Sequence, residues 1–424
     1  MTRGFGVGAA AGLLLLAPMS TAAAQEWSAR IEAEGSMFPA SPADPGQIHN
    51  STSLAFRPEW EFEFGDRRQL IALEGFLRLD SSDPDRTHAD IRVLSWEYVA
   101  NRWELRAGLR RVFWGVTESQ HLVDIINQTD LIESPDGEDK LGQPMVNFAW
   151  ITNFGTVDAF VMPLFRERTY PGSRGRLRFQ PRVETNETVF DEGAESGRLD
   201  LALRWAHSVG AWDLGLSHYY GTSRDPRFMF GGVGDVVDGD ESAVLVPVYE
   251  VIHQTGIDAQ LTTAAWLLKL ETILRTGQGD TFGGLTGGFE YTFGGVFGTV
   301  ADLGVLLEYS WDSRGEAVLG GDPFEDEDSA RRLTEPLGFS VFQNDLFVGT
   351  RLALNDTGST SLLGGGAIDL DTGSLLLILE TSRRIADDWT MEIEARAFVG
   401  ADPGEPLYSL RRDDYLRVAV SRYF

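Results

Sequence analysis

Polar and apolar residues alternate along most of this chain, in segments of about ten residues. Between Ser53 and Phe64 the apolar residues occupy one parity and the charged residues the other: Leu54, Phe56, Trp60, Phe62 and Phe64 against Arg57, Glu59, Glu61 and Glu63. The segment from Trp389 to Phe398 has the same pattern. Because successive side chains of a β-strand point to opposite faces, a period of two predicts strands with one oily and one polar face.

Applied to the whole chain, this pattern predicts eighteen strands. They cover 27–35, 53–64, 69–79, 89–99, 103–113, 145–152, 154–164, 198–207, 211–220, 252–262, 263–274, 282–293, 299–311, 345–354, 361–369, 374–383, 389–398 and 415–424. Most have the length of a membrane-crossing strand. The segment 89–99 fits least well, since Asp90 and Arg92 share the parity of Trp96 and Tyr98.

The predicted connections alternate between short and long. Short turns fall at 65–68, 100–102, 153–155, 208–210, 294–295, 355–360 and 386–388, and longer segments at 36–52, 80–88, 165–197, 222–250, 312–344 and 399–414. This alternation is typical of membrane barrels, which have short periplasmic turns and long external loops. An even number of strands returns both chain ends to the periplasmic side, and we expect no N-terminal plug domain.

The first 24 residues differ from the rest. Arg3 is followed by an apolar run from Gly8 to Leu16 and by Ala22-Ala23-Ala24. This order predicts a secretory signal peptide, cleaved before Gln25. The apolar run is too short to be a membrane anchor. We therefore expect residues 25–424 to form one domain.

The composition narrows the function classes. With 36 Lys and Arg against 64 Asp and Glu, the formal charge is −28, which argues against nucleic acid as a partner. There is no Cys, so neither a disulfide nor a thiolate metal site can form. Eleven Trp, ten Tyr and twenty-five Phe are enough for aromatic girdles at two membrane interfaces.

The chain resembles the porin-like outer-membrane proteins of Gram-negative bacteria. The resemblance rests on the leader, on the alternating strands and on a closing strand that ends in Tyr423-Phe424. Arg422 departs from the usual closing strand of these proteins, in which the third position from the end is commonly apolar or aromatic. The resemblance implies an all-β fold, a transmembrane antiparallel up-and-down β-barrel of about 16–18 strands in the cell outer membrane. Implied partners are outer-membrane lipid and lipopolysaccharide, the barrel assembly machinery, and small solutes or ions. An oligomer is compatible with it.

Residues 114–144 are unlike the other predicted loops. They contain the apolar run Leu122 to Ile126, and Thr117 with Gln120 matches a capping box that would open a short helix. An apolar face has little use in an exposed loop, so we hypothesise that this segment bends into the lumen and narrows the pore. One wall would carry Glu118, Asp124, Asp130 and Glu133, with Asp136, Glu138 and Asp139. Arg106 and Arg110 of the preceding strand would face them, and such opposed charges filter solutes. The alternative is an external cap with solvated charges.

Two kinds of charged loop stand out elsewhere. Acidic runs occur at 83–85, 235–241 and 324–328, and none has the spacing of a calcium loop. We interpret them as solvated and expect no metal site. The segment 166–182 is basic, with Arg166, Arg168, Arg174, Arg176, Arg178 and Arg182. It would attract an anionic solute, contact phosphate headgroups or pair with acidic neighbours, and we favour pairing.

The sequence carries no catalytic signature. There is no nucleophile elbow, no His-Glu-x-x-His motif and no phosphate-binding loop, so we expect neither an enzyme nor a cofactor. Sixteen to eighteen strands leave an aqueous channel. The favoured function is a pore for passive diffusion of small solutes or ions. The alternatives are a dedicated exporter or importer of a polymer or apolar compound, and a non-conducting adhesin or scaffold.

Overall fold

The computed structural model describes residues 24–231, 244–315, 336–338 and 340–424. The predicted signal peptide therefore lies outside the described residues, apart from Ala24, which opens the first strand. The acidic runs at 235–241 and 324–328 lie outside them as well.

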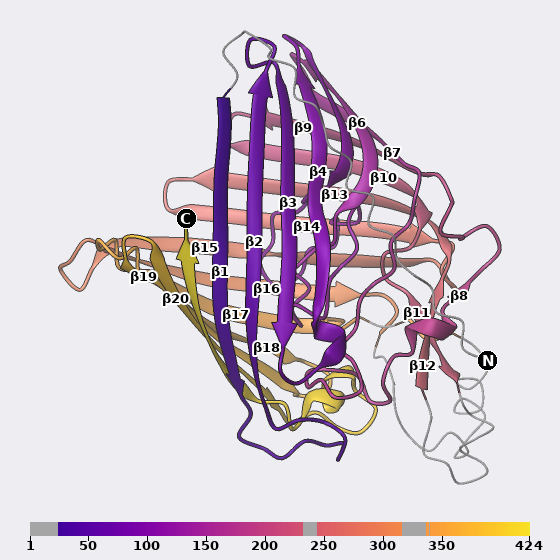
Figure 1. Ribbon diagram of the computed structural model, residues 1–424, viewed down its shortest axis with the longest axis vertical. Helices are drawn as coiled ribbons and strands as arrows, with labels where there is room; N and C mark the ends of the chain where they lie inside the picture. The colour runs from indigo at the N-terminus through magenta and orange to yellow at the C-terminus, as the bar shows by residue number, and fades with distance from the viewer. Residues whose placement is uncertain (1–23, 232–243, 316–335, 339) are drawn as a thin grey trace, which may run out of the picture.

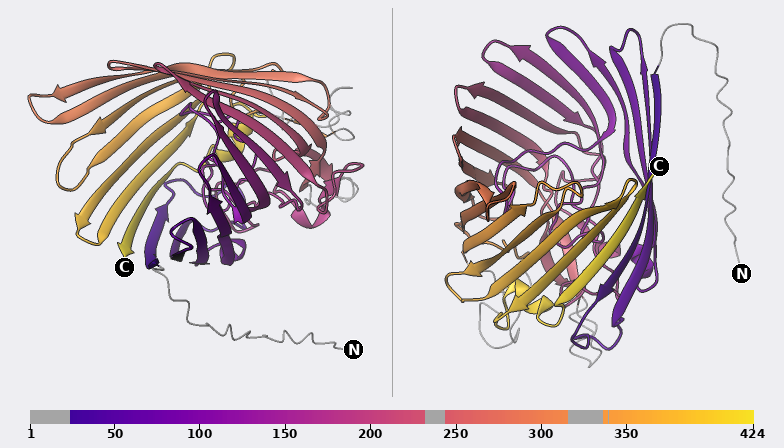
Figure 2. Two further views of the ribbon diagram at one scale, coloured as in Figure 1. Left: turned by 90° about the horizontal axis from the view of Figure 1, so that it is seen from above. Right: turned by 90° about the vertical axis from the view of Figure 1, so that its left-hand side faces the viewer.

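Eighteen antiparallel strands form one closed barrel (Figures 1 and 2). Each pairs with the next barrel strand along the chain, and β21 pairs with β1 to close the cylinder. The barrel strands are β1 (Ala24–Met37), β2 (Asn50–Phe64), β3 (Gln69–Asp80), β4 (His88–Val99), β5 (Trp103–Arg110), β6 (Gln143–Thr152), β7 (Gly155–Met162), β9 (Asp200–Val209), β10 (Trp212–Thr222), β13 (Val251–Thr263), β14 (Trp266–Thr276), β15 (Phe282–Val296), β16 (Ala301–Asp312), β17 (Asn344–Ala353), β18 (Ser361–Asp369), β19 (Leu375–Ala386), β20 (Trp389–Val399) and β21 (Tyr415–Tyr423).

All eighteen predicted strands are confirmed, with bounds that differ by a few residues. A second, three-stranded sheet in the long connections was not predicted. It consists of β8 (Val189–Phe190), β11 (Arg227–Gly231) and β12 (Val244–Tyr249), and Figure 1 shows it beside one end of the barrel. Within the described part of the chain, three short 3-10 helices complete the elements, η1 (Pro84–Arg86), η2 (Thr185–Glu187) and η3 (Pro406–Leu410).

A β-bulge explains the parity conflict in strand β4. Glu74 pairs with Val93 but Gly75 pairs with Ile91, so Arg92 has no partner across the ladder. The extra residue shifts the alternation by one position. Ile91 and Leu94 are therefore both exposed, while Arg92 points inward and is only 4% exposed.

The barrel has an inverted distribution of polarity. Large apolar residues such as Leu54 and Leu274 are exposed on the outside, at 48% and 56%. Charged residues are buried on the inside, and Glu271 and Glu308 are 0% exposed. A closed cylinder that is oily outside and polar inside satisfies its backbone hydrogen bonds and suits a lipid bilayer. Among the described residues, no helix has the length and apolarity that a membrane crossing needs.

An aromatic belt marks the end of the barrel that bears the short turns. It consists of Trp residues that are exposed on the outer face at strand ends, namely Trp27, Trp103, Trp150, Trp212, Trp266 and Trp389. This is where a membrane interface is expected. Arg422 fits into the belt, because its guanidinium lies 4.6 Å from the ring centre of Phe424 and 5.6 Å from that of Trp389. The terminal Phe424 also pairs with β1, through its N–H and the carbonyl oxygen of Ala29 at 3.0 Å.

Candidate functional site

The connection between β5 and β6, residues 111–142, lies inside the barrel; we call it the inner loop. Two wall carboxylates hold it. Glu271 of β14 accepts hydrogen bonds from the backbone N–H groups of Val116 at 2.6 Å, Thr117 at 3.0 Å and Val123 at 3.1 Å. Glu308 of β16 accepts from the N–H of Glu118 at 2.9 Å, and from both the N–H and the hydroxyl of Ser119 at 2.7 Å. The loop thus crosses the lumen to reach strands far from its own.

The predicted short helix after Thr117 is wrong. The residues of the inner loop form turns, bends and isolated bridges. The hydroxyl of Thr117 donates to the carbonyl oxygen of Gln120 at 2.6 Å, so the two residues of the expected capping box are in contact. The wall carboxylates bind the backbone N–H groups of this stretch, Glu308 those of Glu118 and Ser119 and Glu271 that of Val123, so the backbone is satisfied without a helical turn.

The apolar part of the inner loop packs against the wall. Val123, Ile125 and Ile126 are at most 3% exposed and form one cluster with inward-facing residues of β6 to β15. The wall members of this cluster are Met145, Phe160, Met162, Ala202, Tyr219, Ile252, Ile273 and Phe282. Through this cluster the loop packs against one side of the lumen. The side of the loop that faces away from the cluster makes polar contacts.

The four predicted carboxylates of the loop point to different partners. Glu118 forms ion pairs with Arg351 of β17 and, at 3.7 Å, with Lys269 of β14. Asp124 pairs with Lys140 at 3.3 Å within the loop itself.

The other two carboxylates contact the wall opposite this apolar cluster. Asp130 pairs with Arg92 of β4, and it accepts a hydrogen bond from Thr169 at 2.5 Å. Glu133 pairs with Arg78 of β3 at 2.8 Å. The loop is therefore tied by charge to both sides of the barrel.

Arg106 and Arg110, the predicted opposite wall, are bound to groups other than these carboxylates. Arg106 pairs with Glu104 and, at 3.2 Å, with Glu97, and it donates to Asn147 at 3.2 Å. Arg110 donates to the same Asn147 at 3.4 Å. Both point into the lumen, as parity predicts, but carboxylate and amide groups of their own and adjacent strands occupy them.

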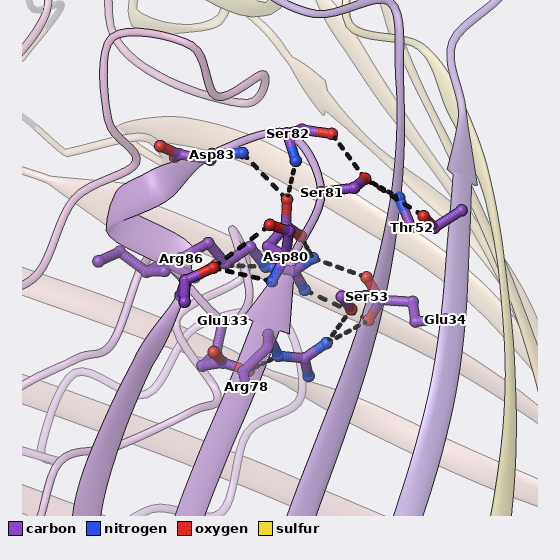
Figure 3. Close-up of polar contacts among 12 residues, drawn as sticks. Glu34, Thr52, Ser53, Arg78, Asp80, Ser81, Ser82, Asp83, Arg86 and Glu133 are labelled. Atoms are coloured by element: carbon purple, nitrogen blue, oxygen red, sulfur yellow. Dashed lines mark hydrogen bonds and ion pairs between the residues drawn. The ribbon is translucent and has the colours of Figure 1, made fainter.

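Arg78 and Arg86 form the centre of a buried ionic cluster (Figure 3). Arg78 contacts Glu34 at 3.3 Å and Glu133 at 2.8 Å, and Arg86 contacts Glu34 at 2.8 Å. With Glu32 and Asp80, four carboxylates share two guanidinium groups. Burial raises the pKa of Glu133 to about 7, and the shared arginines only partly offset this effect.

Sequence reasoning missed the wall residues that hold the loop. These are Glu271 and Glu308, which bind its backbone, and Lys269, Arg351 and Arg396, which bind its side chains. All five lie on the inward parity of predicted strands. Lys269 carried one further signal, since it is one of only two lysines in the chain, and the other is Lys140 of the inner loop.

The basic segment 166–182 pairs with acidic neighbours, as predicted. Its ion pairs are Arg166–Asp90 at 3.0 Å, Arg168–Asp225 at 2.6 Å, Arg176–Asp413 at 2.6 Å, Arg178–Asp44 at 2.7 Å and Arg182–Glu184 at 2.7 Å. Most of these partners lie in other long connections. The pairs fasten the external loops to one another over the inner loop.

The two halves of the lumen differ in their exposure to water. Towards the short turns, inward-facing charges stay exposed: the side chains of Glu63, Arg351 and Glu392 are 44%, 43% and 46% accessible. On the external side, a cavity of about 520 Å³ lies between the inner loop, the long connections and the wall. The inner loop lies between these two spaces and lines the cavity with residues such as Glu118 and Lys140.

Comparison with known proteins matches the chain at the level of architecture. No family model matches it, and neither does any curated protein. Mutants of the porin of Rh. blastica are 11% identical, over 95% of this chain and 100% of the porin, with a TM-score of 0.42. Wzi, a carbohydrate-binding β-barrel involved in group 1 capsule assembly in Escherichia coli, is 11% identical over 92% of this chain and 83% of Wzi, with a TM-score of 0.48. Likenesses this weak support no functional conclusion, and the barrel stands on its own strand pairing.

Proposed function

We propose that this chain, a porin-like β-barrel of the outer membrane, is a pore for passive diffusion of small solutes or ions, narrowed by the inner loop. One observation carries the proposal. The inner loop is fixed across a wide lumen, and its half-buried carboxylate Glu118 meets the cations Lys269 and Arg351 at the boundary between the two lumen spaces. Opposed charges at a narrow point create the transverse field that selects solutes.

The charges between this narrow point and the short turns support a pore with a preference for cations. Glu26 pairs across the ladder with Glu61, and both are exposed on the inward parity near the short turns. Two like charges placed opposite each other destabilise a strand pair, so their presence here is better explained by a solvated and functional lumen. A ring of carboxylates attracts cations into a pore.

Uptake by vesicles tests the proposal. In liposomes that contain the folded protein, we expect swelling in neutral solutes at rates that fall steeply as solute size increases. Shortening the inner loop by removing residues 117–122 should raise the rates for the larger solutes most. A folded barrel that admits no solute of any size would favour the scaffold alternative instead. Efficient entry of one compound alone would favour a dedicated importer.

A further inference from the structure

A second part of the lumen wall, apart from the cluster on which the inner loop packs, departs from the rule that inward positions are polar. On the external half of β17 to β20, Phe347, Leu376 and Phe398 face inward and are 6%, 9% and 7% exposed. Leu407 and Leu410 of η3 pack against them, and all five line the 520 Å³ cavity. We call these five residues the apolar wall.

The apolar wall ends abruptly along its own strands. Two residues further into the lumen from Phe398, Arg396 is bound to Asp136 at 2.6 Å. Polar side chains are thus tolerated on these strands, and the apolar wall is local. Water held against such a surface is unfavourable, whereas an apolar solute gains free energy there. The cavity also has the size usual for a small-molecule site.

A group of arginines lines the same cavity on other strands. Arg168 and Arg275 both donate to Asp225, at 2.6 and 3.3 Å, and Arg314 donates to Asp312 at 2.6 Å. Three guanidinium groups therefore share two carboxylates, which leaves one positive charge in excess. Arg275 and Arg314 also lie 5.4 and 3.9 Å from the ring centre of Phe282, which lines the cavity beside them.

We propose that the cavity binds an amphipathic organic anion, with its apolar body on the apolar wall and its anionic group at Arg314, whose side chain is 25% accessible. The inference rests on the proposed function, because the cavity is the external half of the proposed pore; the exposed carboxylates that favour cations lie at the other end, near the short turns. Arginine is suited to this role, because its planar fork binds carboxylate in two parallel hydrogen bonds. Over the whole lining of the cavity, acidic and basic side chains are equal in number, so the excess of positive charge is confined to this group of arginines.

Equilibrium binding of 2-naphthoate to the full barrel in lipid nanodiscs tests the inference. We expect saturable binding, and binding of naphthylmethylammonium at least about tenfold weaker. Phe398→Ala and Arg314→Gln should each weaken naphthoate binding by about fivefold to tenfold. Phe190→Ala is the matched control, because Phe190 packs on Tyr249 in the small sheet and does not line the cavity. It should leave the affinity unchanged.

Conductance of the same preparations separates this inference from the proposed function. If the barrel conducts ions but naphthoate neither binds nor reduces the current, the amphipathic site is wrong and the pore stands. Equal loss of affinity in Phe398→Ala and Phe190→Ala would also overturn the site. If naphthoate binds with the expected variant pattern but no current flows, the site stands and the pore proposal falls.

Discussion

Glu271 and Glu308 are the residues on which the position of the inner loop depends most. Each places a fully buried carboxylate against backbone N–H groups of the loop. Hydrogen bonds to a charged acceptor are stronger than neutral ones, and a buried donor left without a partner is costly. The lumen wall therefore fixes the loop at two points on its far side.

Replacing one carboxylate should loosen this attachment. Glu308→Gln places an amide NH₂ against the N–H groups of Glu118 and Ser119, which costs about 1–3 kcal/mol in the free energy of unfolding. We expect larger current fluctuations in single-channel records. Glu392→Gln is the control, since Glu392 also faces the lumen but its ion pair is with Arg30 of β1, at 3.9 Å. Equal fluctuations in the two variants would mean that Glu308 does not anchor the loop.

Glu133 gives the barrel a dependence on pH. Its pKa is raised from 4.5 to about 7, so the folded protein favours the protonated form. Its stabilising contribution is complete below about pH 4.5 and is lost as the pH rises through 7. Relative to Glu133→Gln, the free energy of unfolding of the unmodified protein should fall by about 1–3 kcal/mol between pH 5 and 8.

Chemical denaturation at several pH values measures this difference. The comparison should be repeated with His88→Asn in both proteins, because the imidazole of His88 lies 3.6 Å from Glu133 and is itself a titratable group. A difference that is flat across this pH range in the His88→Asn background would show that Glu133 is ionised throughout.

Parity predicted which residues face the lumen but not what they bind. Arg106 and Arg110 do face it, yet Glu97, Glu104 and Asn147 take their hydrogen bonds. Neighbours across a ladder depend on strand register, which one sequence does not fix. The partners of Glu118 lie on β14 and β17, more than a hundred residues away along the chain.

At the level of elements, the strands were predictable and the loops were not. A strand that faces lipid on one side and water on the other has to alternate, so its sequence shows it directly. Even the irregular strand β4 was found, and only its bulge at Arg92 was missed. The inner loop has no such constraint. Its local pattern favoured a helix, but Glu271 and Glu308 compete successfully for its backbone.

A cross-link tests where the inner loop lies. Gln120 of the loop contacts Thr286 of β15, with their side-chain oxygens 3.3 Å apart. Because the chain has no Cys, the pair Gln120→Cys and Thr286→Cys has no background thiols. We expect a short bifunctional reagent to join them in the folded barrel. Gln120→Cys with Ser208→Cys, near the short turn after β9, should not be joined. Failure of the first pair would place the loop elsewhere.

At the scale of the whole molecule, the barrel separates an oily exterior from a charged interior. The closed sheet leaves no free edge, and β1 and β21 complete it through the terminal residues. Ion pairs tie the external loops to one another and to the inner loop, as between Arg176 and Asp413. The sequence predicted the cylinder, but it did not predict how tightly these connections fill its external half.

The direct test of this account is the current through single barrels in a planar bilayer under a KCl gradient. We predict discrete conductance steps and a reversal potential of the sign that indicates a preference for K⁺ over Cl⁻, because exposed carboxylates such as Glu26 and Glu61 line the entrance. Inserted and folded barrels that carry no current at any voltage would contradict the claim that the lumen is an open path past the inner loop.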